Sequence, residues 1–301
     1  MPMRPGQNKL YYLYRFLKWK MGDRSPMSVV AKVTSRCDLK CKHCPWWGLD
    51  TEDAGTEEWL EALRFARNKG AIHLVLEGGE PTCRDDLDEL ISYAKELGML
   101  VVMATNGLRD LGKFDADIYW ISFEGIGEIH DENRGTGVFD RVVSNIKRNQ
   151  DKSVISLVSL NSNNAYQLDA MASFFPSITN GVWFNFTYPY RGVEHMALPP
   201  GKAKEIARQI IELKREFNIL NSDSFLRSVG DPKKDCTPYV TLLVDSDLST
   251  HQGCTVEQLE ECRCDICGLA CYGEVSQAMR FRYDAGKTLF SLFGVVKGSR
   301  G

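Results

Sequence analysis

The sequence predicts an α/β fold, because β-branched and apolar runs alternate with segments of helical periodicity from residue 28 to residue 217. A second observation is the placement of the ten cysteines, six of which follow residue 230. We therefore expect three regions: a basic amphipathic N-terminal segment (1–26), a βα-repeat domain (27–220) and a small cysteine-rich C-terminal extension with an amphipathic tail (221–301).

Six strands are predicted, at residues 28–33, 72–76, 100–105, 121–125 (the end of a strand), 154–160 and 182–188. Helices are predicted at residues 56–69, 86–97, 138–149, 166–174 and 202–217. Strands that alternate with helices form a parallel sheet, and six strands are too few for a closed eight-stranded barrel. The prediction is a partial (β/α)6 TIM-like barrel with its active site at the carboxyl ends of the strands.

Three cysteines follow the first predicted strand directly. Cys37, Cys41 and Cys44 have the spacing C-x3-C-x2-C. Three thiolates can hold three corners of a [4Fe-4S] cluster and leave the fourth iron open to another ligand. The spacing alone would also suit part of a zinc site, although structural zinc uses four ligands.

The second predicted strand leads into Gly78-Gly79-Glu80-Pro81. Glycines let the backbone approach a ligand closely, and a carboxylate beside them can receive a cation. Taken alone, these residues would predict a turn before a helix. Together with the three-cysteine loop, however, they resemble the radical S-adenosylmethionine (SAM) enzymes.

This resemblance implies that Cys37, Cys41 and Cys44 hold a [4Fe-4S] cluster whose open iron is chelated by SAM. The cofactor contacts that it implies are Gly78, Gly79, Glu80, Asn106, Ser122 and His43. His130 and Arg134 are expected to anchor a loop, without a catalytic role.

The resemblance further implies that SAM is cleaved reductively to a 5'-deoxyadenosyl radical, with electrons from ferredoxin or flavodoxin. A non-catalytic iron-sulfur electron carrier is the remote alternative. The intact GGEP motif and the three-cysteine loop argue against it.

A second cysteine motif, C-x2-C-x3-C, lies near the C-terminus, and with one further thiolate it could hold an auxiliary [4Fe-4S] cluster. The expected ligands are Cys254, Cys264, Cys267 and Cys271, with Cys236 as the other choice for the fourth position. Cys262 is interpreted as a bystander. Structural zinc remains the alternative, because four thiolates also suit that metal.

The residues around these cysteines, 236–239, 253–254, 264–274 and 279–282, resemble the tail of the adenosylhopane synthases, radical SAM enzymes of hopanoid lipid biosynthesis. This likeness implies a lipid or isoprenoid substrate that undergoes adenosyl addition or C–H functionalisation. The alternative is hydrogen abstraction from a peptide or another non-lipid substrate.

Basic charge is concentrated at the two ends of a chain whose net charge is −3. Residues 1–26 carry six Lys or Arg against one Asp, and residues 279–301 carry five against one. Because aromatic and leucine residues lie between them, the ends suit helices at a membrane interface, where a lipid substrate could be met. The alternative is a pair of packed helices with solvated lysines.

The acidic remainder of the chain would repel phosphates, so no nucleic acid is expected as a partner. Ten cysteines without a secretory apolar segment predict reduced thiols in the cytoplasm, with peripheral membrane association as a further expectation. No run of 18 apolar residues predicts a membrane span.

Overall fold

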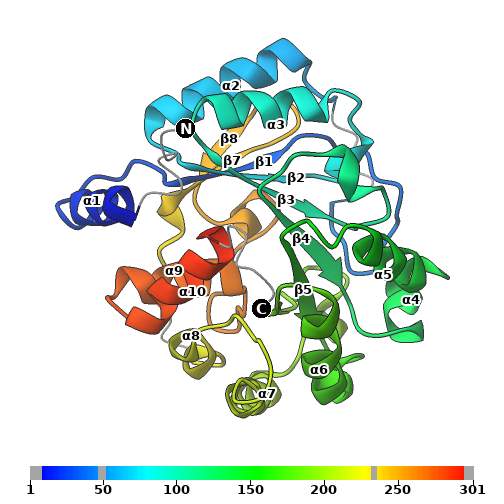
Figure 1. Ribbon diagram of the computed structural model, residues 1–301. Helices are drawn as coiled ribbons and strands as arrows, with labels where there is room; N and C mark the ends of the chain where they lie inside the picture. The colour runs from blue at the N-terminus through cyan, green and yellow to red at the C-terminus, as the bar shows by residue number, and fades with distance from the viewer. Residues whose placement is uncertain (1–8, 47–51, 232–235, 295–301) are drawn as a thin grey trace.

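The computed structural model describes residues 9–46, 52–231 and 236–294. Its centre is one eight-stranded sheet with the strand order β6-β5-β4-β3-β2-β1-β7-β8. The sheet curves around an interior, and helices α2 to α6 lie along its outer side (Figure 1). This is the partial, open barrel that the alternation of strands and helices predicts.

The strands are β1 (Ser28–Lys32), β2 (His73–Glu77), β3 (Leu100–Thr105), β4 (Ile118–Phe123), β5 (Val154–Leu160), β6 (Val182–Phe186), β7 (Thr241–Val244) and β8 (Thr250–Gln252). Strands β1 to β7 pair in parallel, and β8 pairs with β7 in the antiparallel sense. The parallel strands are largely buried and rich in Val, Ile and Leu, as expected for a sheet covered on both faces.

The α-helices are α1 (Lys9–Lys20), α2 (Thr56–Lys69), α3 (Leu87–Glu96), α4 (Glu128–Arg134), α5 (Val138–Arg148), α6 (Leu168–Ile178), α7 (Pro200–Leu213), α8 (Asp223–Ser228), α9 (Ala270–Met279) and α10 (Tyr283–Gly294). Local chemistry sets their ends. In α2, for example, Glu57 and Glu58 lie in the first turn, and Gly70 ends the helix in the left-handed conformation at φ 112°.

Strands β7 and β8 extend the sheet beyond the six predicted strands. They come from the region that the sequence analysis assigned to the cysteine-rich extension. Val30 of β1 pairs with Val75 of β2 on one side and with Leu243 of β7 on the other. Without β7, the first strand would leave an open edge of unpaired backbone groups.

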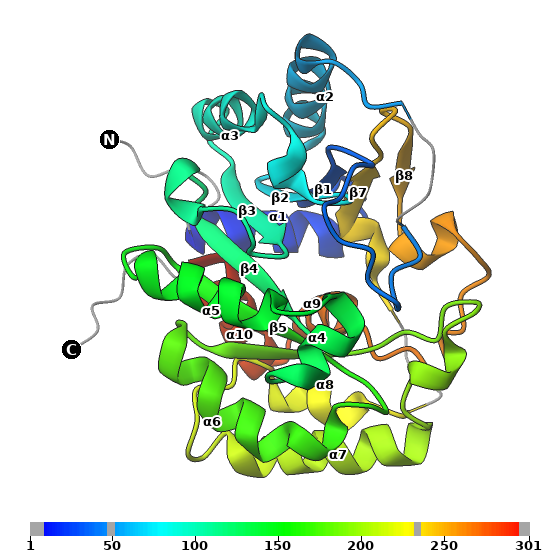
Figure 2. The same cartoon turned by 90° about the vertical axis from the view of Figure 1, so that its right-hand side faces the viewer.

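Helices α1, α9 and α10 gather at the amino-terminal ends of the first strands (Figures 1 and 2). The ring of Tyr12 in α1 packs against His73, the first residue of β2, and meets Phe290 of α10 edge to face, with ring centroids 5.2 Å apart in each pair. The opposite, carboxyl ends of the strands are therefore left for the cysteine loop. Among the described helices, none has the length and apolar character needed to cross a bilayer.

Candidate active site

A cavity of about 170 Å³ lies at the carboxyl ends of β2, β3 and β4, under the cysteine loop that follows β1. The structure brings together around it all nine residues that the sequence analysis placed at the first cluster and its cofactor. These are Cys37, Cys41, His43, Cys44, Gly78, Gly79, Glu80, Asn106 and Ser122. Four separate segments of the chain therefore converge on one cavity.

The start of the cysteine loop is held by Asp53. Its carboxylate accepts hydrogen bonds from the Thr34 hydroxyl and, at 2.8 Å, from the backbone N–H of Ser35. It also pairs with Arg36, whose Nε lies 3.2 Å from Oδ2. These bonds fix the direction in which the chain leaves β1 and enters the three-cysteine segment.

Gly78 and Gly79 pack against the cysteine loop itself. A Cβ at Gly78 would overlap the carbonyl oxygen of Thr34, and one at Gly79 would overlap that of Arg36. The backbone N–H of Gly79 donates to Thr34 at 2.8 Å, and that of Glu80 donates to Arg36 at 2.8 Å. The sequence analysis explained the glycines by a close approach to the ligand, but the structure adds that they join the loop to the end of β2.

Glu80 is buried and connects the ends of β2 and β3. Its Oε1 accepts from the hydroxyls of Thr82 at 2.7 Å and Thr105 at 2.6 Å, and its Oε2 accepts from the backbone N–H of Asn106 at 2.7 Å. Burial raises the pKa of Glu80, while these hydrogen bonds act to lower it. The side-chain amide of Asn106 donates to Asp38 in the cysteine loop at 2.7 Å.

A buried charge network lies beneath Cys41 and Cys44. Oε1 of Glu124, just past the end of β4, is 3.3 Å from Nη2 of Arg134 and 3.4 Å from Nε2 of His43. Burial raises the pKa of the Cys41 thiol, and the neighbouring Arg134 lowers it. The sequence analysis gave Glu124 no role, although this residue lies in the strand end predicted at residues 121–125.

The two residues expected to be loop anchors differ in position. His130 is fully buried: its Nδ1 accepts from the backbone N–H of Glu124 at 3.2 Å, and burial lowers its pKa to about 3. Arg134, by contrast, lines the cavity, and its buried Nε has no hydrogen-bond partner among the described residues. An unpartnered donor next to a thiolate or a carboxylate ligand would gain a charge-assisted hydrogen bond.

This donor set fits a [4Fe-4S] cluster with SAM. The thiols of Cys37, Cys41 and Cys44 surround one cavity, and Arg134 offers a donor to an anionic group there. In the described parts of the chain, no three His, Cys, Asp or Glu side chains converge as a single metal ion would require. A four-iron cluster does not need such convergence, because each thiolate binds a different iron.

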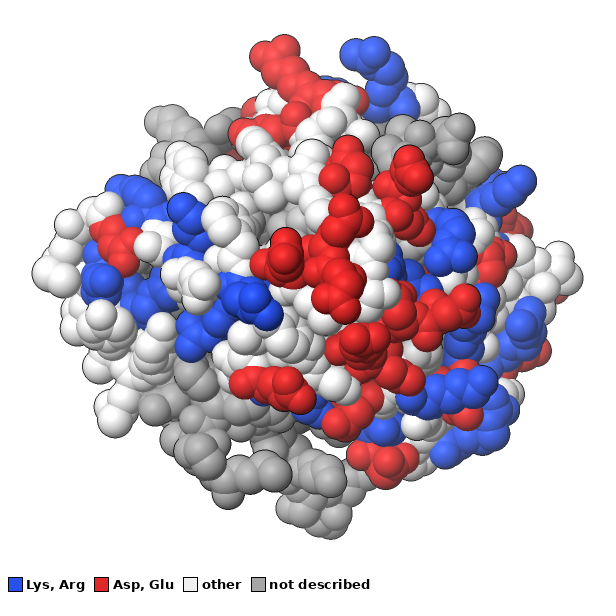
Figure 3. All heavy atoms as spheres, turned by 90° about the horizontal axis from the view of Figure 1, so that it is seen from above, with Lys and Arg blue, Asp and Glu red and all other residues white. Residues whose placement is uncertain are grey.

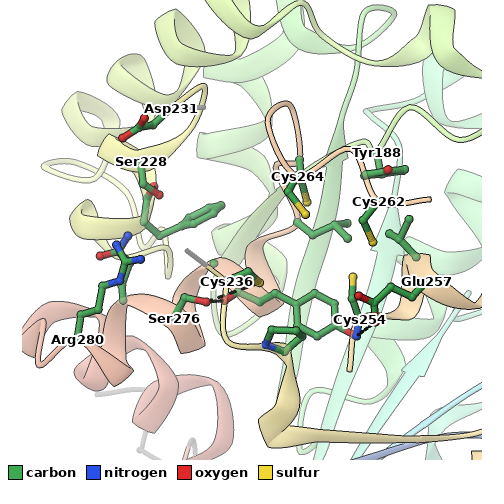
Figure 4. A pocket seen from close by; sticks show the side chains of 18 residues that line it. Tyr188, Ser228, Asp231, Cys236, Cys254, Glu257, Cys262, Cys264, Ser276 and Arg280 are labelled. Carbon is green, nitrogen blue, oxygen red and sulfur yellow. Dashed lines mark hydrogen bonds between the residues drawn. The ribbon is translucent and has the colours of Figure 1, made fainter. Parts of the chain in front are cut away.

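The C-terminal cysteines surround a second cavity, of about 110 Å³ (Figure 4). Five cysteines line it: Cys236, Cys254, Cys262, Cys264 and Cys267. Cys254 and Cys262 lie within hydrogen-bonding reach of each other. The structure therefore groups four of the five predicted ligands and adds Cys262, which the sequence analysis interpreted as a bystander.

Cys271 lines a different cavity, of about 180 Å³, inside the barrel. Glu77 and Ala104 line both this barrel cavity and the cavity of the cysteine loop. Cys271, the second residue of α9, therefore lines the barrel cavity, while its thiol remains close enough to Cys267 and Cys254 to interact with them electrostatically.

The fold and the site together are a partial parallel barrel with a three-cysteine loop at the carboxyl end of its first strand. Residues 31–163 match the model of the radical SAM superfamily.

Curated relatives match part of the chain. It is 35% identical over 143 residues to the Fe-coproporphyrin III synthase of Methanosarcina barkeri, a match that covers 44% of this chain and 36% of the relative. It is 32% identical over 130 residues to the pre-heme d1 synthase of Dinoroseobacter shibae (40% and 32%). The PqqA peptide cyclase of Methylorubrum extorquens is 34% identical over 121 residues (37% and 32%). The chain thus spans about a third of the length of these relatives.

Solved structures share the fold over most of the chain. Streptococcus suis SuiB bound to S-adenosylmethionine superposes with a TM-score of 0.67 at 16% identity, covering 85% of this chain and 68% of SuiB. Native anSMEcpe with bound AdoMet gives a TM-score of 0.59 at 17% identity, covering 90% of this chain and 100% of anSMEcpe. At these identities the likeness establishes the fold.

Proposed function

We propose that this protein binds a [4Fe-4S] cluster through Cys37, Cys41 and Cys44 and cleaves SAM reductively at that cluster. The observation that carries the proposal is the convergence of these thiols with the GGEP segment, Asn106 and Ser122 around one cavity. When bound, the cluster supplies one electron, and SAM yields methionine and a 5'-deoxyadenosyl radical. The electron would come from ferredoxin or flavodoxin.

The chain's own residues would orient the cofactor and exclude water. Arg134 would donate its unpartnered Nε to an anionic group in the cavity, and Glu124 would hold the guanidinium in place. Asn106, tied to Asp38, and Glu80 would shape the side of the cavity formed by β2 and β3.

The second cysteine cavity would hold an auxiliary cluster. Its candidate ligands are Cys236, Cys254, Cys262, Cys264 and Cys267, of which a [4Fe-4S] cluster needs four at most. Zinc is the alternative occupant, because four thiolates also suit it, but the thiols would have to move together, since no three of them in the described residues converge as a single ion requires. Cys271 is a weaker candidate ligand, since it faces the barrel interior.

For the substrate, we propose hydrogen abstraction from a peptide or another non-lipid molecule. The named relatives support this choice, because they are a peptide cyclase and two synthases whose names refer to a porphyrin and a heme. The second candidate is adenosyl addition to a lipid or isoprenoid. It is favoured by the barrel cavity, in which Val30, Val75 and Leu157 give an apolar lining.

Anaerobic turnover tests the assignment. Reconstituted protein with dithionite and SAM should form 5'-deoxyadenosine, and the Cys37→Ala/Cys41→Ala/Cys44→Ala variant should form at least a hundredfold less. Cys83→Ala is the matched control, because Cys83 lies near this loop but does not line its cavity. Equal cleavage by the triple variant would contradict the assignment.

The two substrate classes are separated by the fate of the adenosyl group. In reactions with candidate peptides, hydrogen abstraction should give free 5'-deoxyadenosine and a modified peptide. In reactions with total polar lipids, lipids heavier by an adenosyl group would instead establish addition. Mass spectrometry of both mixtures decides between them.

A further inference from the structure

A fourth cavity, of about 460 Å³, lies at the opposite end of the barrel from the cysteine loop. Helices α1, α9 and α10 enclose it against Ser28 and His73, the first residues of β1 and β2. Most of its lining is apolar, from side chains such as Leu13, Met279 and Leu289. Its volume falls within the range of about 300–1,000 Å³ that is common for small-molecule sites.

The cavity opens onto a surface with exposed apolar side chains. Eleven large apolar residues are exposed in the described chain, and eight of them lie in residues 10–21 and 281–290. These eight are Leu10, Leu13, Tyr14, Leu17, Met21, Phe281, Tyr283 and Phe290. Of these, Leu10, Leu13 and Phe290 also line the cavity, so its rim is apolar as well. Apolar exposure concentrated in this way indicates an interaction surface.

Basic side chains surround these apolar residues. The exposed ones are Lys20, Arg24, Arg280, Arg282 and Lys287. Acidic groups here are already engaged: Asp23 pairs with Lys18 at 3.4 Å, and Asp284 accepts hydrogen bonds from Ser224. At the left of Figure 3, where α1 lies, blue and white atoms predominate, whereas acidic atoms run across the centre.

Aromatic and basic residues on this surface also contact one another. Nζ of Lys20 lies 4.8 Å from the centre of the Phe281 ring, and the rings of Phe16 and Phe281 meet edge to face at 4.7 Å. Leucine and aromatic side chains bordered by lysine and arginine are the composition of helices that lie in the headgroup region of anionic membranes.

We propose that this terminal-helix face, residues 10–24 and 280–290, docks on an anionic phospholipid membrane and that the cavity behind it takes one hydrocarbon chain. The basic residues attract the anionic headgroups, and the apolar rim and cavity receive the hydrocarbon chain of one lipid. The cavity floor carries no charge at neutral pH, because burial lowers the pKa of His73 to about 3. This binding does not depend on the proposed radical chemistry.

Vesicle cosedimentation tests the docking. The protein should bind phosphatidylcholine vesicles that contain phosphatidylglycerol at least tenfold more tightly than phosphatidylcholine vesicles alone. Leu13→Glu/Leu17→Glu should weaken that binding at least tenfold, because both side chains are about half exposed on α1. Phe65→Glu is the matched control: Phe65 is 50% exposed on α2, outside this face.

Two outcomes would overturn the docking proposal. One is equal binding by the Leu13→Glu/Leu17→Glu variant, with its fold verified by circular dichroism. The other is a wild-type protein that ignores anionic vesicles but forms dimers through this face, which would make the surface a protein interface.

The cavity is tested without vesicles by a fluorescent fatty acid, cis-parinaric acid. Gly286 of α10 lines the cavity and has open space where a Cβ would project, so Gly286→Phe should fill it. We expect at least tenfold weaker probe binding. Gly201→Phe on the exposed surface of α7, also with open space, should leave probe binding unchanged. If Gly286→Phe binds the probe as tightly as the wild type does, the cavity is not a binding site for a hydrocarbon chain.

Discussion

Arg134 and Glu124 form a buried ion pair beneath the cysteine loop, with Nη2 of the arginine 3.3 Å from Oε1 of the glutamate. Nδ2 of Asn161 donates a hydrogen bond to Oε2 of the same glutamate at 3.2 Å. Both charged residues lie outside the cysteine and GGEP motifs. Glu124 nevertheless holds the guanidinium of Arg134 at the cavity that those motifs line.

Breaking this pair should cost stability. Arg134→Gln leaves a buried carboxylate without its main cation, and we expect a loss of about 3–5 kcal/mol in the free energy of unfolding. Arg134→Gln/Glu124→Gln should lose clearly less than the sum of its two single variants, because no buried charge is left unpaired. Anaerobic urea denaturation of all four proteins measures this coupling. Additive losses would contradict a direct pair.

Gly79→Ala should impair cluster assembly. The added methyl overlaps the Arg36 carbonyl, so the cysteine loop must shift, at a cost of about 1–3 kcal/mol. We expect most of the visible iron-sulfur absorbance to be lost after reconstitution. Gly201→Ala, a change in the exposed helix α7 with open space around it, should keep full absorbance. Normal absorbance in Gly79→Ala would show that the loop tolerates the displacement.

Replacing Cys262 and replacing Cys271 should have different effects on the metal content. Cys262→Ser should reduce the metal bound at the second cavity, whereas Cys271→Ser should leave it near the wild-type level, since only Cys262 lines that cavity. Iron and zinc contents, measured in a chain that already lacks the first three cysteines, give the answer. The reverse pattern would restore Cys271 as a ligand.

His73 should make the protein sensitive to acid. Burial lowers its pKa to about 3 in the folded state, against about 6.5 in the unfolded chain, so the unfolded state binds the extra proton between these values. Stability contributed by neutral His73 is present above pH 6.5 and is lost as pH falls toward 3. Between pH 7 and pH 5 the loss is about 2 kcal/mol.

The control for this effect is His73→Gln, which cannot take up the proton. Between pH 7 and pH 5, its free energy of unfolding should fall by about 2 kcal/mol less than that of the wild type. Urea denaturation at the two pH values checks this. Identical pH dependence in the two proteins would rule out His73 as the source.

The first part of the site was readable from the sequence because its residues are local. Cys37, Cys41 and Cys44 lie within eight residues, and Gly78 to Glu80 directly follow a recognisable strand. Asn106 and Ser122 are expected from the resemblance to the radical SAM enzymes, and both lie at the carboxyl ends of their strands, which meet at one edge of a parallel sheet. The six strands are predicted from another local property, the alternation of apolar strand-like runs with segments of helical periodicity.

Arg134 and the C-terminal cysteines could not be assigned in this way. The sequence gives the spacing of residues along the chain but not the distances between their side chains. From the motif Cys264-x2-Cys267-x3-Cys271, all three cysteines are therefore expected to bind the same metal. In the structure, Cys271 is the second residue of helix α9 and lines the barrel cavity, whereas Cys264 and Cys267 line the second cysteine cavity. Cys262 falls outside the spacing pattern, yet the fold carries it to Cys254.

The sequence by itself determined the parallel βα architecture, the three-cysteine loop and the residues that approach it, because strand periodicity and short motifs are local properties of the chain. Only the tertiary structure decided that β7 completes the sheet beside β1, that Glu124 holds Arg134 beneath the cysteines, and that the two chain ends enclose an apolar cavity. Each of these brings together segments far apart in the sequence, and their pairing depends on packing and on the burial of charge, which no local pattern encodes.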